Sequence, residues 1–280
     1  MHRESGDVHR LSPLGREVAY DSDYDPGLLF PIARDDSRAG LGLDASSLPF
    51  TGCDVWNAWE LSWLDGRGKP VVARARLHLP AASTNIVESK SLKLYLNSLN
   101  QTVFSHPDEV AAVVTRDLSA AAGARVGVEI ALPEAGELPS VAIPGECLDS
   151  LPVSIRHYQA EPSLLRPDPR RGEVEETLHT HLLRSLCPVT AQPDWGSVMI
   201  RYRGQAVDRG GLLAYIISFR QHQDYHEHCV ERMFVDIRRA LSPQQLTVEA
   251  RYLRRGGLDI NPFRSSRADV APVPGRWYRQ

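Results

Sequence analysis

Residues 92–99 read LKLYLNSL and residues 212–219 read LLAYIISF, and the two stretches align without a gap at an offset of 120 residues. The first stretch places its apolar side chains on one stripe of a helix, because they recur at intervals of three and four residues. The identical pairs in this alignment are Leu92 with Leu212, Tyr95 with Tyr215, and Ser98 with Ser218. The match predicts a related helix in each half of the chain.

The same offset aligns segments beyond this helix. It places Val110 on Val230, and the dipeptide Val128-Glu129 on Val248-Glu249. One offset that serves a helix, a second helix and a strand indicates an internal repeat. We therefore predict that the chain contains a duplicated ββααβ unit.

The pattern around the first copy predicts a hairpin, two helices and a strand. Residues 71–79 (VVARARLHL) alternate apolar with polar side chains, as a half-buried strand does. Pro107 suits the first turn of a helix, where its missing N–H costs nothing. The predicted elements are strands over 55–64 and 71–79 joined by a turn at 65–68, helices over 88–99 and 106–121, and a strand over 125–132.

The second copy is predicted to contain an amphipathic helix over 173–186, a strand over 195–202, a helix over 225–241 and a charged glycine turn over 254–259. A proline- and arginine-rich loop over about 160–172 precedes it. We divide the chain into an N-terminal arm over 1–50, a first unit over 51–150 and a second unit over 151–280.

Composition limits the classes of protein to consider. Among 280 residues, 42% are apolar and 24% charged, and 32 Lys and Arg face 35 Asp and Glu, so we expect a globular protein without direct affinity for nucleic acid. No apolar run reaches the roughly 18–20 residues of a membrane span, and the N-terminus lacks the apolar segment of a secretory signal. The four cysteines form no CxxC pair. We predict a cytoplasmic protein with free thiols.

Cys187 and Asp194 form the first candidate for chemistry. Cys187 follows the predicted helix over 173–186 and precedes two prolines, so we expect an accessible thiol where a helix passes into a loop. A nucleophilic cysteine with an acid seven residues on suits covalent catalysis. The pattern alone also fits, and favours, a small buried cysteine beside an aspartate in a turn.

His226 and Glu227 form the second candidate, because both can face a pocket only at the start of a helix. Residues 222–229 read HQDYHEHC, so His222, His226, His228 and Cys229 are all possible metal ligands. The segment matches no established metal motif. Three interpretations stay open here: solvated histidines at a helix end, a polar ligand site, and a metal site.

Two basic segments are candidates for binding an anion. Residues 88–93 read ESKSLK, in which hydroxyls, lysines and helix N–H groups suit a phosphate. Arg254-Arg255-Gly256-Gly257 offers two guanidinium groups beside a flexible backbone. Each also fits a purely structural role, as a helix start and as a hairpin turn. Neither a Rossmann nor a P-loop glycine motif is present.

Four segments together resemble the family of NADPH-dependent 7-cyano-7-deazaguanine reductases, the nitrile reductases of queuosine biosynthesis. They are ESKSLKLYLNS (88–98), LCPVTAQPDWG (186–196), ISFRQHQDYHEHCVER (217–232) and YLRRGGLDINPFRS (252–265). The resemblance runs over nearly the whole chain and fits the long form with two units. It implies the α+β tunnelling fold: tandem ββααββ units with antiparallel sheets, helices on one face of each sheet, and assembly into a barrel.

The resemblance also implies a reaction. In this family a nitrile is reduced by four electrons to a primary amine with two NADPH, which here means conversion of 7-cyano-7-deazaguanine to 7-aminomethyl-7-deazaguanine. By analogy Cys187 adds to the nitrile carbon to form a thioimide, and Asp194 supplies the proton. The sulfur must attack and later leave, which favours a moderately lowered thiol pKa.

The binding residues implied by the resemblance lie in both halves. Those implied for the deazapurine are Val87, Glu88, Ser89, His226 and Glu227, and those implied for NADPH are Ser89, Lys90, Arg255 and Gly256. No metal enters the implied chemistry. A homodimer is expected, because an incomplete barrel leaves unpaired sheet edges. Two alternatives stay open: a zinc-dependent hydrolase of the pterin type, and a purine-binding module without catalysis.

Overall fold

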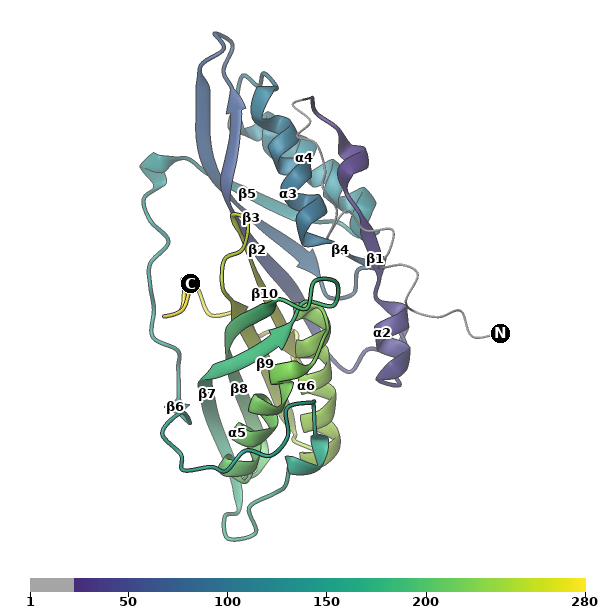
Figure 1. The fold of residues 1–280 in the computed structure, drawn as a ribbon, viewed down its shortest axis with the longest axis vertical. Helices are drawn as coiled ribbons and strands as arrows, with labels where there is room; N and C mark the ends of the chain where they lie inside the picture. The colour runs from purple at the N-terminus through teal and green to yellow at the C-terminus, as the bar shows by residue number, and fades with distance from the viewer. Residues whose placement is uncertain (1–22) are drawn as a thin grey trace, which may run out of the picture. The chain divides into compact units, whose positions relative to one another are not determined.

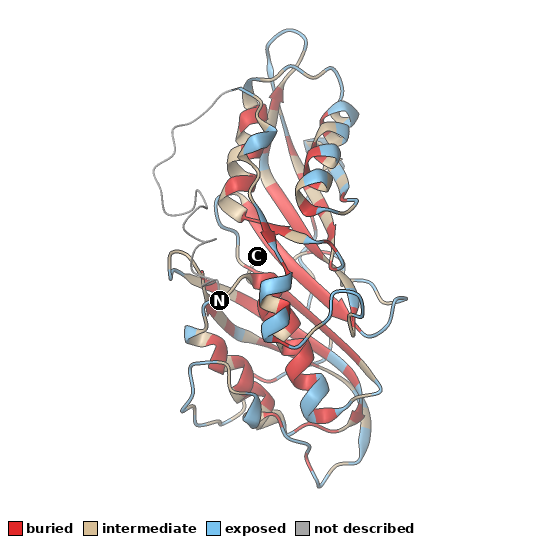
Figure 2. Ribbon diagram, turned by 90° about the vertical axis from the view of Figure 1, so that its right-hand side faces the viewer, coloured by how far each residue is buried: buried red, intermediate tan, exposed pale blue. Residues whose placement is uncertain are grey.

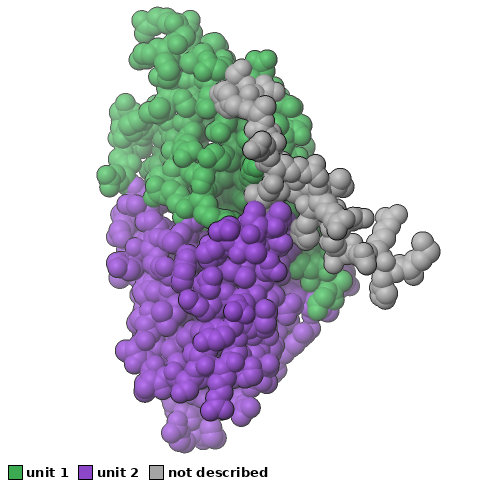
Figure 3. Space-filling view, in the orientation of Figure 1, with its two compact units in different colours: residues 1–40, 53–137, 254–260 green, residues 41–52, 138–253, 261–280 purple. Residues whose placement is uncertain are grey.

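The computed structural model describes residues 23–280, and the first 22 residues lie outside the described part. The chain divides into two compact units, coloured separately in Figure 3. Unit 1 comprises the described part of residues 1–40 together with 53–137 and 254–260, and unit 2 comprises 41–52, 138–253 and 261–280. The predicted arm over 1–50 lies partly outside the described residues. Its described part contains strand β1 (Pro31–Ala33) and helix α2 (Asp35–Gly40).

Unit 1 is built on an antiparallel sheet with the strand order β5-β3-β2. Its strands are β2 (Thr51–Leu64), β3 (Pro70–Pro80) and β5 (Gly127–Ala131), and its longer helices are α3 (Ser89–Ser98) and α4 (Pro107–Ala122). A separate pair joins β1 to β4 (Asn85–Val87). Helices α3 and α4 lie over one face of the sheet (Figure 1). The predicted hairpin, helices and strand of this part of the chain are confirmed.

The core of unit 1 lies between this sheet face and the two helices. Trp56 and Leu77 point inward from the strands, and Leu92, Tyr95 and Leu118 meet them from the helices, all fully buried. Figure 2 shows these helices buried along one face and exposed along the other. The helical stripe that contains Tyr95 in the sequence is therefore the side of α3 that packs on the sheet.

Unit 2 has the strand order β10-β9-β8-β7-β6. Its strands are β6 (Glu146–Cys147), β7 (Glu173–Leu186), β8 (Pro193–Gln205), β9 (Gln245–Tyr252) and β10 (Leu258–Ser265), whose first residues belong to unit 1. The helices are α5 (Arg209–Ser218) and α6 (His226–Leu241). The β10–β9, β9–β8 and β8–β7 pairs are antiparallel, and the short β6 runs parallel to β7. The predicted helix over 225–241 and strand over 195–202 are confirmed.

The helix predicted over 173–186 is wrong, because this segment is the long strand β7. Its residues pair with β8 along most of their length, from Glu173 opposite Gln205 to Leu186 opposite Pro193. A register shift between Thr180 and Leu183 interrupts the alternation of buried and exposed residues. The interruption gives the segment an irregular pattern that a helix could also produce, and pairing with β8 decides the outcome.

Each unit contains an equivalent set of internal contacts, and these show which residues of the repeat correspond. In unit 1 the Tyr95 hydroxyl donates to Asp117, and in unit 2 Tyr215 donates to Asp236, each over 2.7 Å. Strands β2 and β7 each carry a register shift, between Ala58 and Leu61 and between Thr180 and Leu183. The helix pairs α3/α5 and α4/α6 start 120 and 119 residues apart, so the gapless alignment of Val110 with Val230 is wrong by one residue.

Across residues 23–280 we find no helix that combines the length and the apolar character needed to span a bilayer.

Candidate active site

The turn between β7 and β8 places Cys187 and Asp194 at one end of unit 2. The Cys187 N–H donates to the Gln192 carbonyl over 2.9 Å, and the Ala191 N–H donates back to the Cys187 carbonyl over 3.0 Å. Asp194 is the second residue of β8 and lies opposite Ser185 in the antiparallel pair of β7 and β8. Cys187 is 2% and Asp194 3% exposed. The expectation of an accessible thiol at a helix exit is therefore wrong: the thiol follows a strand and is buried.

The chain entering α6 is held against the end of β7. The N–H of Leu186 donates to the carbonyl of His222 over 2.8 Å, and the N–H of Asp224 donates to the carbonyl of Leu186 over 3.1 Å. These two bonds set the position at which α6 begins, next to the Cys187 turn. His226 and Glu227 are the first two residues of α6, so the predicted helix start is confirmed.

His226 and Asp194 form the closest contact between predicted site residues. Nε2 of His226 lies 3.0 Å from Oδ2 of Asp194, and both side chains are almost fully buried. The ring N–H is not aligned as a hydrogen bond, so the contact is a close approach of the two side chains. The structure thus brings the predicted proton donor and a predicted substrate residue together in unit 2.

Tyr252 supports the other face of this histidine. The rings of His226 and Tyr252 are stacked, with centroids 3.7 Å apart and an interplanar angle of 7°. Tyr252 ends β9 and is fully buried, with the polar side chains of Ser185 and Cys229 nearby. Burial raises the pKa of both the Tyr252 hydroxyl and the Cys229 thiol well above their ordinary values, so both stay neutral.

Tyr252 and Ser185 were not predicted as site residues. Tyr252 opens the quoted segment 252–265, but nothing in its sequence position indicates that it lies against His226. The contact depends on the pairing of β9 with β8, in which Tyr252 lies opposite Gly196. Only long-range strand pairing of this kind places the ring there.

The other histidines of the segment surround Asp224. Nδ1 of His228 lies 3.1 Å from Oδ1 of Asp224, and Nε2 of His222 lies 3.6 Å from Oδ2. Burial alone would raise the pKa of Asp224, but the neighbouring His222 and His228 side chains outweigh it and hold this pKa well below its ordinary range. Asp224 therefore engages two of the histidines that the sequence left open as metal ligands.

Glu227 is 2% exposed in the first turn of α6. The exposed N–H groups and dipole of a helix start favour a carboxylate at this position. A second buried carboxylate, Glu88, lies in unit 1 immediately before α3. It accepts hydrogen bonds from the N–H groups of Lys90 and Ser91, each over 2.8 Å, so its observed role is to cap the helix.

The other predicted residues of unit 1 lie around the same helix start. Val87 ends β4, buried and paired with Pro31 of β1. Ser89 and Lys90, both partly exposed, are the first two residues of α3. The serine hydroxyl donates to Glu88 over 3.4 Å.

The Arg254–Gly257 turn lies close to the side of α3. Gly256 has a φ of +56°, and a Cβ at this position would lie 3.0 Å from Cδ of Lys93. Glycine therefore allows the turn to approach the lysine stem. The guanidinium of Arg254 stacks on Trp59 at 4.1 Å from the ring centroid, and Arg255 is exposed beside it. Lys93, one turn of helix after Lys90, adds a cation that was not among the predicted site residues.

The predicted residues thus form two groups. Cys187, Asp194, His226 and Glu227 belong to unit 2, whereas Val87, Glu88, Ser89, Lys90, Arg255 and Gly256 belong to unit 1. The first group offers a thiol, an acid and an imidazole, which suit covalent chemistry with proton transfer. The second offers hydroxyl, ammonium and guanidinium groups, which suit a phosphate.

Two family models match the chain and define the class of protein. Residues 20–130 match the family described as nitrile reductase, 7-cyano-7-deazaguanine-reductase N-term, and residues 193–270 match the family described as QueF-like protein. The first match covers the start of α3 with Glu88, Ser89 and Lys90. The second covers Asp194, the start of α6 and the Arg254–Gly257 turn. A nitrile reductase is the class that these matches define.

Curated relatives narrow this class. The NADPH-dependent 7-cyano-7-deazaguanine reductase of Chromohalobacter salexigens is 57% identical over 271 residues, covering 96% of both chains. The protein of the same name from Bordetella pertussis is 57% identical over 270 residues, covering 96% of this chain and 98% of its own. The chain belongs to the NADPH-dependent 7-cyano-7-deazaguanine reductase family. The apo archaeosine synthase QueF-Like superposes with a TM-score of only 0.30 at 16% identity, too low to support an inference.

Proposed function

We propose that this protein reduces the nitrile of 7-cyano-7-deazaguanine to the aminomethyl group with two molecules of NADPH. The observation that carries the proposal is the cluster at the end of unit 2. There Cys187 lies on the turn that leads to Asp194, and Asp194 lies 3.0 Å from His226. Membership in the family, at 57% identity over almost the full length, supports the same reaction.

Cys187 is the proposed nucleophile. Its S–H bond breaks as the sulfur forms a C–S bond with the nitrile carbon, while Asp194 delivers a proton to the nitrile nitrogen and the thiol proton restores the acid. The product is a thioimide. This addition changes no oxidation state. It converts a nitrile, a poor hydride acceptor, into a C=N group that accepts hydride more readily.

Two reductions complete the sequence, and bound NADPH supplies the hydride for each. One hydride and one proton convert the thioimide to a thiohemiaminal. The C–S bond then breaks, which returns the Cys187 thiol and leaves an imine. A second hydride and proton convert the imine to the primary amine. Four electrons and four hydrogens have then been added to the nitrile, and the enzyme is unchanged.

His226 and Tyr252 are proposed to position the acid. The stacked tyrosine fixes the plane of the imidazole, and the imidazole contacts the carboxyl group of Asp194. Burial excludes water from this group of side chains, which strengthens their mutual electrostatic interactions. We propose that this arrangement sets the direction and protonation of the acid during thiol addition.

Recognition of the deazapurine is assigned to His226 and Glu227, with Val87, Glu88 and Ser89 from unit 1. Carboxylates accept hydrogen bonds from the N–H groups on the guanine-like edge. NADPH is assigned to Ser89, Lys90, Arg255 and Gly256. These residues fit the phosphates of NADPH, because the start of α3 provides a lysine ammonium group and the nearby Gly256 turn provides an arginine guanidinium group.

The architecture proposed for this function is a tandem of tunnelling-fold units, over 51–150 and 151–280, with an arm over 1–50. The Tyr–Asp bonds and register shifts shared by the two units support a duplication. Sheet edges at β5 and β6 support assembly of copies into a barrel, since exposed edges favour further pairing. We propose a cytoplasmic homodimer that binds no nucleic acid directly.

The decisive experiment is to incubate the protein with 7-cyano-7-deazaguanine without NADPH and measure its intact mass. We expect a mass increase equal to the substrate, retained by Cys53→Ala and lost in Cys187→Ala, which still binds the substrate reversibly. Addition of NADPH should then consume two equivalents per substrate. Binding without an adduct and without NADPH consumption would contradict the proposal and identify a purine-binding module.

A further inference from the structure

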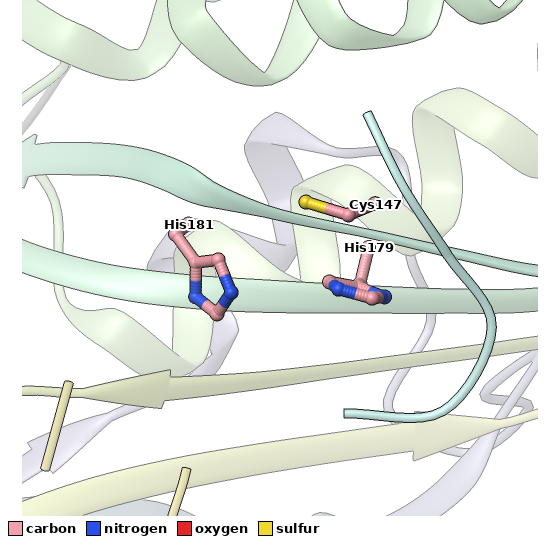
Figure 4. Close-up of side chains that lie close together, drawn as sticks. All are labelled: Cys147, His179 and His181. Atoms are coloured by element: carbon pink, nitrogen blue, oxygen red, sulfur yellow. The ribbon is translucent and has the colours of Figure 1, made fainter. Parts of the chain in front are cut away.

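Three side chains outside the proposed active site form a compact group of metal ligands. Cys147 in β6 and His179 and His181 in β7 offer ligand atoms that all lie within 4.8 Å of one another. Figure 4 shows the side chains of Cys147, His179 and His181 close to one another. We propose that these three residues bind Zn²⁺, with a fourth position open to water or another ligand.

The pairing of β6 with β7 brings the group together. In this short parallel pair Cys147 lies directly opposite His179. His181 lies two residues further along β7, within the register shift that follows Thr180. The rings of His179 and His181 are 5.6 Å apart between centroids. Two histidines and one cysteine therefore converge from two adjacent strands.

Hydrogen bonds orient both imidazoles for metal binding. Nδ1 of His179 lies 3.1 Å from the carbonyl oxygen of Pro144. A carbonyl only accepts, so Nδ1 carries the proton and Nε2 carries the lone pair. Nδ1 of His181 lies 2.8 Å from the hydroxyl of Ser197, which can hold the same tautomer. Metal-binding histidines ordinarily have their second nitrogen bonded in this way.

The segment that carries Cys147 is held tightly against β7 on both sides of the cysteine. Before it, Gly145 has a φ of +84°, and a Cβ there would lie 2.0 Å from the Thr177 carbonyl oxygen, so only glycine permits this approach. After it, Asp149 accepts from the Thr180 hydroxyl over 2.5 Å and from the His181 N–H over 3.2 Å. The cysteine is therefore kept near the histidines in the absence of a metal.

The irregularity of β7 contributes to this arrangement. The ladder with β8 is interrupted after Thr180, so the N–H of His181 is available to bond the Asp149 carboxylate instead. The bulge therefore allows the backbone of His181 to bond Asp149, in the loop that follows Cys147. The corresponding bulge of β2 bonds differently, with the Trp59 N–H donating to Gly257 over 2.9 Å. Residues 58–61, which form that bulge, contain neither histidine nor cysteine.

The donor set selects the class of metal. One thiolate and two imidazoles suit borderline-soft Zn²⁺, at about 2.3 Å for sulfur and about 2.0–2.1 Å for nitrogen. Binding displaces the thiol proton and forms a Zn–S bond, with no change of oxidation state. Cys147 is exposed, so its side chain can move to close the tetrahedron. None of the three residues is used in the proposed reduction.

The test is a zinc titration of the metal-free, reduced full-length protein in competition with a chelating indicator. We expect one tightly bound equivalent, lost in Cys147→Ser and His179→Gln and retained in Cys53→Ser and His157→Gln. Ser197→Ala should weaken binding by about 10–100-fold, as removal of a residue that orients a ligand does. Circular dichroism checks that each variant is folded, which is expected since Cys147 lies on the surface.

Co²⁺ distinguishes this site from the active-site cysteine, because a thiolate ligand adds a charge-transfer absorption band. The band should appear in the wild type and in Cys187→Ser and be absent from Cys147→Ser. Loss of the band in Cys187→Ser would place the metal at the active site and overturn the proposal. Unchanged zinc affinity in Cys147→Ser, or no binding by the wild type, would overturn it as well.

Discussion

Nε2 of His226 lies 3.0 Å from Oδ2 of Asp194, and the two side chains are 6% and 2% exposed. They reach this contact from different elements, the start of α6 and the start of β8. A residue expected to recognise the substrate is therefore in direct contact with the residue expected to supply the proton. Binding of the deazapurine at His226 can thus affect the orientation of the acid.

Replacement of Asp194 by asparagine tests its role as a proton donor. The amide keeps the size of the carboxyl group but cannot deliver a proton, so the thioimide should form about 10²–10⁴-fold more slowly. Quenching the reaction at successive times without NADPH, and measuring the intact mass of the protein in each sample, gives this rate. Substrate binding and thermal unfolding should stay near wild type. Normal adduct formation with slow hydride steps would limit Asp194 to the later stages.

Tyr252 should act on the reaction only through His226. In Tyr252→Leu the stacked ring is lost, so the imidazole is no longer held against Asp194 and adduct formation should slow by about 10-fold, in line with an aromatic contact of about 0.5–1.5 kcal/mol. Tyr252→Phe keeps the ring and should restore most of the rate. Equal defects in both variants would assign the effect to the hydroxyl group instead of the stacking.

Glu227→Gln should weaken binding of 7-cyano-7-deazaguanine by about 1–3 kcal/mol, because the amide removes the negative charge and replaces one accepting oxygen by an NH2 group that cannot accept from the ligand N–H groups. Isothermal titration measures this loss, and Glu173→Gln, an exposed carboxylate of β7, is the matched control. NADPH affinity should change little in either variant. A comparable loss of affinity for both ligands would mean that the start of α6 has been disrupted.

The elements that sequence predicted correctly are those whose pattern is local. Helix α3 follows from the stripe that includes Tyr95, and the β2–β3 hairpin from alternation on either side of a glycine turn. Strand β7 was assigned to a helix because its bulge breaks the alternation and its residues include good helix formers. Pairing with β8 overrides that local preference, and no short window of sequence contains the partner strand.

The candidate site shows the same division. The resemblance identified Cys187 and Asp194, and the helix start at His226 followed from the pattern of α6. The sequence left both a buried and an accessible Cys187 open, because the contacts that bury it, the turn to Gln192 and the segment bonded to Leu186, are not visible in the local pattern. The stacking of Tyr252 likewise depends on the position of β9 beside β8. Both features depend on contacts between segments that are distant in sequence, and residue spacing along the chain does not reveal such contacts.

Asp224 should make stability depend on pH in the acid range. Its folded pKa lies below its ordinary value, so its contribution is complete above about pH 4 and is lost as the pH falls through the folded pKa. Urea unfolding between pH 7 and pH 3 should show Asp224→Asn less stable at neutral pH, with the difference from wild type shrinking toward pH 3. Asp36→Asn, at an exposed position, is the control. A difference independent of pH would contradict this assignment.

The ion pair between Glu231 and Arg264 should be the strongest single polar contribution to the position of α6. Nε and Nη2 of Arg264 donate to Oε1 of Glu231 over 3.1 and 2.9 Å, and both side chains are 0% exposed. The pair joins α6 to β10, and the guanidinium also lies over the ring of Phe50. Removal of one partner of a buried ion pair typically costs about 3–5 kcal/mol.

Glu231→Gln should therefore lower the free energy of unfolding by that amount, measured by urea denaturation at pH 7. Asp269→Asn removes the carboxylate of a surface pair with Arg267 and should stay close to wild type, since water screens exposed pairs. The double variant Glu231→Met/Arg264→Met should recover much of the loss, because no unpaired charge remains. A small effect of Glu231→Gln, similar to that of Asp269→Asn, would show that the start of α6 is held by its apolar packing instead.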